Sequence, residues 1–422
     1  MVDVTRDARA TPGTVVSSMD GPAQRTLLIT LTGRDRPGVT SRLFRTLAEF
    51  PLTVADVEQV VIRGRLVLGV LLTYIEGADI GRVWNAAEQV ATDLDMEVEL
   101  STGREKRLPK RRGRLHVTVL GAPLLPAAMA GIAGRIAANG ANIDRIERLA
   151  ATPVTCIEMD VSGADPEALR AGLATEAAEQ QVDIAVQHGG LHRRAKRLIV
   201  MDVDSTLIQG EVIELLAEHA GCLEEVAKVT EAAMRGDLDF EGSLRERVAL
   251  LAGLDATAID DVRGKLELAA GARTMVRTLK RLGYDFAIVS GGFTQVTDAL
   301  VEDLGIDYSM ANTLEIENGK LTGRVTGPVI DRAGKAAALE RFAREAGVPL
   351  SQTVAIGDGA NDLDMLQVAG LGVAYNAKPV VRQAADTAVN VPYLDTILFL
   401  LGISREEVEA ADAADVSWTG GS

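Results

Sequence analysis

The sequence has few cysteines and few aromatic residues. Among its 422 residues only two are cysteines, and Phe, Trp and Tyr together make up 3%. Cys156 and Cys222 lie far apart in the chain, so they form neither the framework of a small disulfide-bonded domain nor a Cys-x-x-Cys metal site. We expect both to be free thiols in a reducing compartment.

Segments that would direct the chain to a membrane are also lacking. The N-terminus carries no charged segment followed by an apolar stretch, which is the pattern of a secretory signal. No apolar run reaches the ~18–20 residues that a membrane-spanning helix needs. We therefore expect a soluble cytoplasmic protein.

Positive charge is in short supply. The chain has 44 Lys and Arg against 60 Asp and Glu, a formal net charge of −16. Nucleic-acid-binding proteins usually present a basic face, often with aromatic side chains on which bases stack, so we expect no nucleic-acid partner. What is present is ordinary: 47% hydrophobic and 25% charged residues are typical of packed globular domains.

A repeat in the N-terminal half predicts two small α/β modules. The segments LLITLTG (27–33) and LHVTVLG (115–121) both read as an apolar strand that ends in Thr-x-x-Gly. An amphipathic helix pattern follows each one, and two further strand patterns come after it. Asp56 and Asp144 recur at the same offset of 88 residues as the two glycines that end the strands.

The patterns divide the chain into segments of different character. The basic stretch between the modules reads either as a binding patch or as a solvated connector, and we favour the connector. The predicted segments are a tail at 1–24, modules at 25–100 and 114–187 with a linker at 101–113, a hinge at 188–196, a third domain at 197–405 and a tail at 406–422.

The third domain carries short, continuous apolar runs that alternate with helical patterns. RLIVM (197–201), FAIV (286–289) and TVAI (353–356) are apolar on both faces, which predicts buried parallel strands in a doubly wound α/β sheet. Each run is followed by a polar cluster, in turn DVDST, SGGF and GDGAND. Since ligands of such sheets bind at the carboxyl ends of the strands, the three clusters predict one site.

Residues from about 211 to 270 show mostly helical patterns. This stretch is too long for one crossover helix. We interpret it as a helical cap above the strand ends, in a position suited to closing the site and excluding water.

Two aspartates follow the first strand. Asp202 and Asp204 would repel each other unless a cation or a proton lies between them, and Mg²⁺ prefers such hard oxygen ligands. We predict a Mg²⁺ site formed by Asp202, Asp204 and Asp358, with Asp362 as a further ligand or a supporting residue. Asp202 could then attack phosphorus, while Asp204 serves as general acid and then as base.

Two more elements suit an anionic substrate. Ser290, with the backbone N–H groups that follow it, provides a turn of the kind that binds anions. Lys335 begins a helix pattern after a glycine, where its charge could stabilise a transition state on phosphorus.

The four segments DVDST, VSGGF, the Gly-Lys helix start and GDGANDLDM together resemble the motifs of the haloacid dehalogenase-like superfamily, over residues of about 197–400. The segments MDVDSTLIQGEVIELLAEHAG and AMRGDLDFEGSLRERVALL resemble the phosphoserine phosphatase family more closely. The resemblance implies a Rossmann-like core with a helical cap. It also implies Mg²⁺-dependent hydrolysis of phosphoserine through an aspartyl-phosphate, the last step of serine biosynthesis.

The same resemblance assigns roles at the substrate. It implies Glu211 for the ammonium and Arg247 for the carboxylate, which a guanidinium can grip with two hydrogen bonds. Met234 and Phe240 would form an apolar wall. The substrate-binding set that the resemblance implies is Glu211, Met234, Phe240, Arg247, Ser290, Gly291, Lys335 and Asn361.

The paired modules resemble ACT domains, which are small βαββαβ amino-acid sensors. GRDRPGVT (33–40) is similar to the turn where such domains bind effectors, which implies Asp35 and Gly38 as effector contacts. The second copy reads GAPLLPAAM there, but its GANID (140–144) could offer Asn142 across an interface. We expect a homodimer formed through these modules and serine as effector; the other interpretation is that the modules only support dimerisation.

Two other functions remain open at this point. A phosphotransferase would use the same motifs to pass the phosphoryl group to another amino-acid alcohol. A non-catalytic amino-acid sensor would keep the fold, although the intact Asp202, Asp204, Lys335 and Asp358 argue against it.

Overall fold

The computed structural model describes residues 24–75, 77–104, 114–190, 193, 195–235 and 238–419, without the side chains of 24, 234, 235 and 415–419. Most of the predicted N-terminal tail, most of the linker and the side chain of Met234 therefore lie outside the described part. The chain forms two units, residues 1–110 and 111–422, each of which is treated separately below.

The first unit is a four-stranded antiparallel sheet with two helices, in the order β-α-β-β-α-β. The strand order is β2-β3-β1-β4. Alternate residues of β1, namely Leu27, Ile29 and Leu31, are fully buried, as the period of two in a half-buried strand requires. The elements are β1 (Gln24–Arg34), α1 (Val39–Leu47), β2 (Thr53–Ile62), β3 (Arg65–Ile75), α2 (Ile80–Asp93) and β4 (Met96–Arg104).

The second unit begins with a module of the same plan. Its strand order, β6-β7-β5-β8, repeats that of the first unit strand for strand, which confirms the predicted duplication. Its elements are β5 (Arg114–Gly121), α3 (Pro126–Ala138), β6 (Asn142–Ala150), β7 (Thr155–Ser162), α4 (Pro166–Gln180) and β8 (Asp183–His188).

The third domain is built on a seven-stranded sheet of order β12-β11-β10-β9-β13-β14-β15. All neighbouring strands of this sheet run parallel except those of the β11–β12 hairpin, so the prediction of a parallel α/β core is confirmed. The strands are β9 (Leu198–Met201), β10 (Asp285–Phe293), β11 (Tyr308–Glu317), β12 (Lys320–Thr326), β13 (Thr353–Gly357), β14 (Gly372–Tyr375) and β15 (Thr387–Val389).

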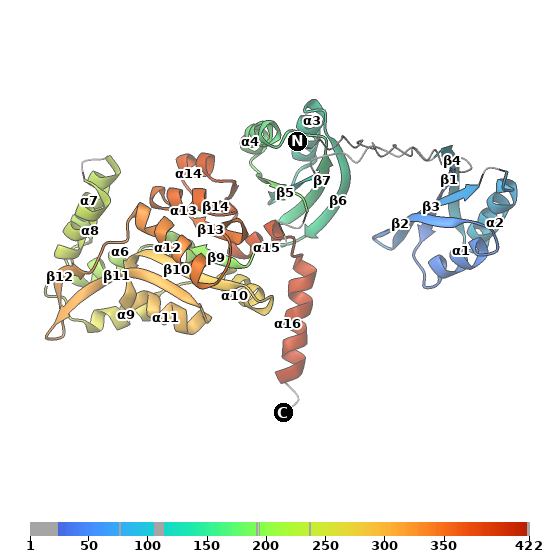
Figure 1. The fold of residues 1–422 in the computed structure, drawn as a ribbon. Helices are drawn as coiled ribbons and strands as arrows, with labels where there is room; N and C mark the ends of the chain where they lie inside the picture. The colour runs from blue at the N-terminus through green and yellow to red at the C-terminus, as the bar shows by residue number, and fades with distance from the viewer. Residues whose placement is uncertain are drawn as a thin grey trace, which may run out of the picture. The chain divides into compact units, whose positions relative to one another are not determined.

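Helices connect these strands. Four of them, α6 to α9, occupy the stretch predicted as a cap, and α8 packs beside β12 (Figure 1). The helices are α6 (Val212–Ala220), α7 (Leu223–Arg235), α8 (Phe240–Ala249), α9 (Thr257–Lys265), α10 (Ala272–Arg281), α11 (Thr294–Leu304), α12 (Arg332–Glu345), α13 (Leu363–Val368), α14 (Pro379–Ala384), α15 (Ile397–Leu400) and α16 (Arg405–Thr419), with short turns η1 (Val203–Leu207), η2 (Leu350–Gln352), η3 (Ala360–Asp362) and η4 (Leu394–Thr396).

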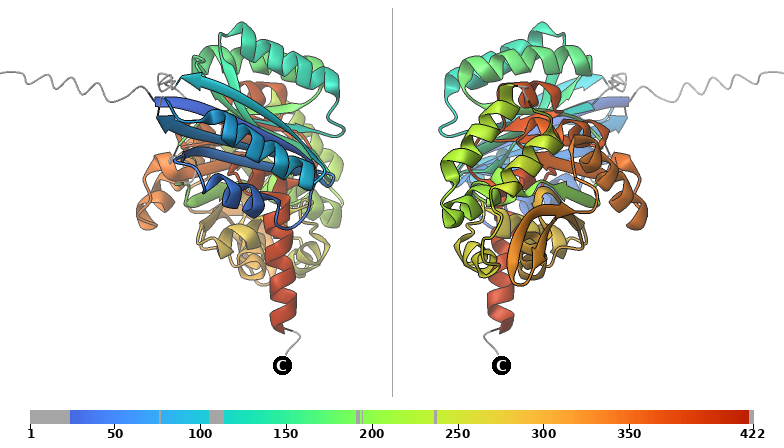
Figure 2. Two further views of the ribbon diagram at one scale, coloured as in Figure 1. Left: turned by 90° about the vertical axis from the view of Figure 1, so that its right-hand side faces the viewer. Right: turned by 90° about the vertical axis from the view of Figure 1, so that its left-hand side faces the viewer.

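The C-terminal stretch that the sequence indicates as a tail contains the helix α16. It extends away from the body of the second unit in each view (Figure 2). Across the described residues, none of the helices combines the length and the apolar character needed to cross a bilayer.

Polar contacts attach the second module to the third domain. The carboxylate of Asp183 accepts hydrogen bonds from the backbone N and the Nδ2 of Asn390, both at 2.6 Å. Arg193, in the segment predicted as a hinge, is 6% exposed and donates from Nε to the carbonyl oxygen of Leu400 at 2.9 Å. The described part of this segment is therefore fixed to the third domain.

Candidate active site

The candidate site lies where the central strand of the large sheet ends. The register pairs Met201, the last residue of β9, with Ile288 of β10 on one side and with Ile356 of β13 on the other. The N–H of Asp202 donates to the carbonyl oxygen of Ile356 at 2.9 Å. The strands that follow β9 in the chain are added first on one side of it, as β10 to β12, and then on the other, as β13 to β15. Ligands of such sheets bind at the strand ends where the order reverses in this way, and Asp202 lies there.

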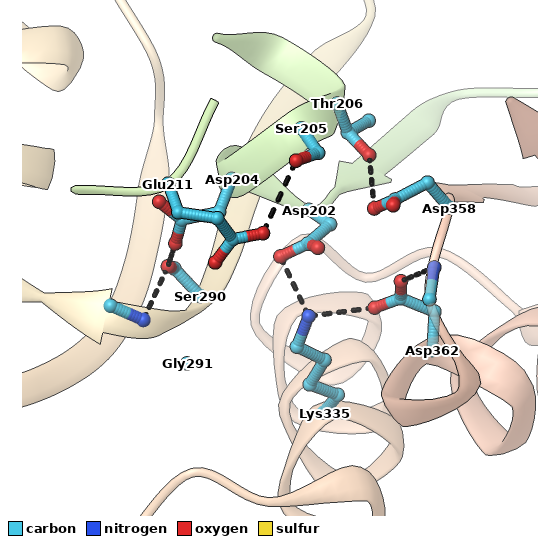
Figure 3. Close-up of polar contacts among 12 residues, drawn as sticks. Asp202, Asp204, Ser205, Thr206, Glu211, Ser290, Gly291, Lys335, Asp358 and Asp362 are labelled. Atoms are coloured by element: carbon cyan, nitrogen blue, oxygen red, sulfur yellow. Dashed lines mark hydrogen bonds and ion pairs between the residues drawn. The ribbon is translucent and has the colours of Figure 1, made fainter. Parts of the chain in front are cut away.

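Asp202, Lys335 and Asp362 form a buried chain of charges (Figure 3). Lys335 Nζ lies 2.6 Å from Asp202 Oδ1 and 2.6 Å from Asp362 Oδ1. The exposed fraction of the three residues is at most 4%. Burial by itself would lower the pKa of Lys335, but the negative charges of Asp202 and Asp362 raise it above its ordinary value, so the ammonium stays charged.

Three carboxylates converge on the same side of Asp202. Asp202, Asp358 and Asp362 each offer an oxygen, and these oxygens lie within 4.8 Å of one another. Asp358 is held by the hydroxyl of Thr206, which donates to its Oδ1 at 3.1 Å. Burial, together with the charge of Asp362, raises the pKa of Asp358 to about 6. One ammonium does not balance three carboxylates, so the all-oxygen cluster fits a hard divalent cation.

Asp204 is not part of this cluster. Its carboxylate accepts hydrogen bonds from the N–H of Val212 at 2.9 Å and from the hydroxyl of Ser290 at 3.1 Å. The turn that follows, with Ser205 at φ 58°, carries the chain on toward Glu211. The side chains of Asp202 and Asp204 thus have different partners (Figure 3), and burial raises the pKa of the Asp204 carboxyl.

The Ser290 loop is braced by a residue that the sequence analysis missed. Ser290 Oγ accepts a hydrogen bond from the N–H of Gly292 at 2.7 Å. Asn312, only 2% exposed on β11, donates from Nδ2 to the carbonyl oxygen of Gly291 at 2.8 Å and accepts from the N–H of Ile330 at 2.8 Å. Asn312 therefore links the Ser290 loop to the segment just before the Lys335 helix.

The predicted specificity residues come from the helical insertion. Ser205 Oγ donates to Glu211 Oε1 at 3.2 Å, and burial followed by the charge of Asp204 raises the pKa of Glu211 to about 7. Arg247 is also buried in large part, which lowers the pKa of its guanidinium, while the charges of Glu211 and Asp204 oppose that shift. Glu211 and Arg247 therefore influence each other's pKa, and the charge of Asp204 acts on both.

Phe240 is the first residue of α8, and its ring lies against the Ser290 loop. A Cβ built on Gly291 would lie 3.0 Å from Phe240 Cζ, so the ring occupies the space above that glycine. Asn361 lies in η3, immediately before Asp362. Of the predicted site residues in the third domain, only Met234 has a side chain outside the described part.

The predicted effector loop lines a pocket in the first unit. The pocket has a volume of about 490 Å³, and Asp35, Gly38 and Gln59 are among the residues that line it. Gly38 has φ 95°, a conformation that glycine adopts without strain. Asn142 belongs to the second unit, where its Nδ2 donates to Asp144 Oδ1 at 2.8 Å; its role across an interface stays a prediction.

Comparison with family models agrees with this architecture. Residues 199–367 match the haloacid dehalogenase-like hydrolases. Residues 25–101 and residues 114–187 each match an ACT domain. The fold and the matched segments thus define a haloacid dehalogenase-like hydrolase that carries two ACT domains.

Relatives extend the match to nearly the whole chain. The sequence is 64% identical to a phosphoserine phosphatase of Streptomyces coelicolor, over 92% of this chain and 94% of that one. It is 51% identical to a phosphoserine phosphatase of Mycobacterium tuberculosis, over 93% and 97%. A probable phosphoserine phosphatase structure from Vibrio cholerae superposes with a TM-score of 0.56 and 37% identity, over 72% and 91% of the two chains. The chain belongs to the phosphoserine phosphatase family.

Proposed function

We propose that this protein hydrolyses O-phospho-L-serine to L-serine and phosphate. The observation that carries the proposal is that two aspartates of one loop have different partners. Asp202 contacts Lys335 within the carboxylate cluster, whereas Asp204 accepts a hydrogen bond from Ser290 and lies outside that cluster. This difference supports a nucleophilic role for Asp202 and a proton-transfer role for Asp204. The relatives named above, which cover almost the full chain, support phosphoserine as the substrate.

The acidic cluster is proposed to hold Mg²⁺. Asp202 and Asp358 would provide carboxylate ligands, with Asp362 as a ligand or as the partner that holds Lys335. The side chain of Asp204, which the sequence analysis also named as a ligand, is engaged by Val212 and Ser290. When bound, the ion would supply positive charge beside the phosphate oxygens.

The proposed reaction assigns a step to each of these side chains. A carboxylate oxygen of Asp202 forms a bond to phosphorus as the bond to the serine oxygen breaks, and Asp204 gives its proton to that oxygen. Asp204 then takes a proton from a water molecule that attacks the aspartyl-phosphate, which releases phosphate and restores Asp202. Lys335 stabilises the charge on the transferring group.

Recognition of the amino acid is proposed to rest on the helical insertion. Glu211 would bind the ammonium, and Arg247 would bind the carboxylate. Phe240 and Met234 would form the apolar wall, while Ser290, Gly291, Lys335 and Asn361 contact the phosphate. The mutual electrostatic influence of Glu211 and Arg247 supports a site that binds both charges of an amino acid.

The proposal is tested by measuring phosphate release from phosphoserine. We expect turnover with Mg²⁺, loss of turnover after chelation and recovery on adding Mg²⁺ back. Asp202→Asn should abolish turnover while the circular dichroism spectrum stays that of the wild type. If Asp202→Asn retained near wild-type activity, the aspartyl-phosphate route would be wrong.

A phosphotransferase is distinguished by its second product. With an added amino-acid alcohol, a transferase would form the phosphorylated alcohol, detectable by ³¹P NMR, and would release less free phosphate. For the proposed phosphatase we expect free phosphate at the same rate with and without the alcohol. A non-catalytic sensor would bind an amino acid without any turnover.

The ACT domains are proposed to form a homodimer and to respond to serine. The edge strand β2 supports the first point, since all ten of its residues are exposed and Val57, Val60 and Ile62 are 40–63% exposed. Replacing Val57 and Val60 with Lys should then yield monomers in sedimentation analysis.

Serine should bind at the Asp35–Gly38 loop and change activity or association state. A cytoplasmic location also stays a prediction.

A further inference from the structure

A second cluster of metal-ligating side chains lies in the second ACT domain, outside the site described above. It lines a pocket of about 420 Å³ that the sheet of this module forms with the Leu401–Glu407 segment of the third domain. His116, Glu158 and Asp160 each offer one ligand atom, and these atoms lie within 4.8 Å of one another. No role proposed above involves any of the three.

The sheet itself brings these side chains together. His116 on β5 is the register partner of Asp160 on β7, and Glu158 stands two residues before Asp160. Residues i and i+2 of a strand project from the same face, and side chains of register partners are neighbours. His116 Nδ1 consequently lies 2.7 Å from Asp160 Oδ1 and 3.7 Å from Glu158 Oε1.

The histidine atom that faces the carboxylates is buried. His116 Nδ1 is inaccessible to solvent, and its polar neighbours are the carboxylates of Asp160 and Glu158. The side chains of His116 and Glu158 are 22% and 13% exposed. Two carboxylates beside a ring nitrogen repel one another unless a proton or a cation lies between them.

The positive charges in the pocket are already engaged. Arg193 pairs with Glu158 Oε2 and also donates to the carbonyl oxygens of Leu400 and Phe399. Arg145 lies 3.3 Å from Glu147. The contact with Arg193 holds the Glu158 side chain in place while its Oε1 faces His116, which is how metal-binding side chains are commonly oriented.

We propose that His116, Glu158 and Asp160 bind a divalent transition-metal ion of the Zn²⁺ type. One imidazole nitrogen and two carboxylate oxygens suit Zn²⁺, which takes N and O ligands in a tetrahedral arrangement. Mg²⁺ prefers oxygen alone, so the two clusters of this protein differ in metal preference. Three protein ligands leave one position, which opens into the pocket.

Cobalt(II) is the probe, because tetrahedral Co²⁺ with a nitrogen ligand absorbs visible light. The full-length chain is titrated after Asp202→Asn and Asp358→Asn have weakened the active-site cluster. We expect a visible band that saturates at one ion per chain and that added Zn²⁺ removes. The same band should be absent with His116→Ala, or should need at least 10-fold more Co²⁺.

Matched variants keep the result interpretable. His188→Ala removes an exposed histidine of the same domain and should leave the band unchanged. Asp160→Asn keeps the size of the side chain and should also weaken binding about 10-fold or more, with an unchanged circular dichroism spectrum. Equal Co²⁺ spectra in the wild type, His116→Ala and Asp160→Asn would overturn the proposal and would indicate that His116 is simply a protonated partner of Asp160. The assay does not depend on phosphatase activity.

Discussion

The ammonium of Lys335 lies 2.6 Å from Asp362 Oδ1, and neither side chain is exposed to solvent. Asp362 is fixed in turn by the N–H of Gly359, which donates to its Oδ2 at 2.9 Å. A charged group that is buried in this way depends on its partners, because desolvation is expensive without them. Asp362, held by Gly359, therefore helps to keep Lys335 in position beside Asp202.

Replacing Lys335 with Met should impair both catalysis and stability. The variant removes the charge that would stabilise the transferring phosphoryl group, so kcat for phosphoserine should fall about 10²–10³-fold. It also leaves Asp202 and Asp362 without their common partner, which should lower the free energy of unfolding by about 3–5 kcal/mol. Steady-state kinetics and urea denaturation measure the two effects. Lys228→Met, at an exposed position of α7, is the control, and wild-type kcat in Lys335→Met would falsify the role.

Asn312 should act on catalysis without touching the substrate. Asn312→Asp keeps an oxygen for the N–H of Ile330 but loses the donor to Gly291. Losing such a buried hydrogen bond costs about 1–3 kcal/mol, so we expect kcat/KM to fall about 10-fold or more. The loss should appear mainly in kcat if Ser290 and Lys335 are misplaced. Asn318→Gly, in the β11–β12 turn, is the control and should behave like the wild type. If Asn312→Asp showed the same kinetics as this control, Asn312 would have no role in positioning the site.

Arg247 should decide which phosphate esters are good substrates. Arg247→Ala should raise KM for phosphoserine about 30-fold or more, since losing one partner of a buried charged contact costs at least ~2 kcal/mol. An aryl phosphate lacks the carboxylate and should be hydrolysed almost as before. Arg245→Ala is the matched control, because Arg245 lies on the same helix and pairs with Glu241 at the surface. An equal loss on both substrates would exclude the carboxylate role.

The binding of phosphoserine should weaken below neutral pH because of Glu211. Its pKa is raised to about 7, so the fraction of ionised Glu211 falls as the pH drops through 7, and with it the attraction for an ammonium. KM for phosphoserine should rise about 10-fold per pH unit below that point. An aryl phosphate corrects for titration of the phosphate itself, because it has no ammonium. In Glu211→Gln the two substrates should show the same pH dependence; if the wild type already did so, the assignment would fail.

Much of the catalytic domain could be predicted from local patterns. The three apolar runs become β9, β10 and β13, since parallel strands that are buried on both faces read as continuous apolar runs. Asp202 and Asp358 directly follow β9 and β13 as predicted, whereas Ser290 lies within β10, where the pairing with β11 shifts register. The sequence could not predict the orientation of Asp204, because the turn at Ser205 and the hydrogen bond from Ser290 direct that side chain.

The roles of some other residues could not be predicted, because no local sequence pattern marks them. Asn312 lies within an ordinary strand pattern, and its hydrogen bonds join segments that are 18 and 21 residues distant in the chain. The His116 cluster is equally invisible, because its members belong to two strands whose register only the folded sheet defines. Arg193 was read as part of a hinge, yet two of its partners, Leu400 and Phe399, lie more than 200 residues further on.

The sequence alone determined the duplicated modules, the parallel core, the chemical groups of the site and the family. Those features rest on periodicity and short motifs, which act over a few neighbouring residues. The tertiary structure decided which carboxylates meet, which of them Lys335 contacts, and how the second ACT domain is attached to the catalytic domain. Such contacts join distant segments through burial and hydrogen-bond geometry, so they exist only once the strands and helices are packed together.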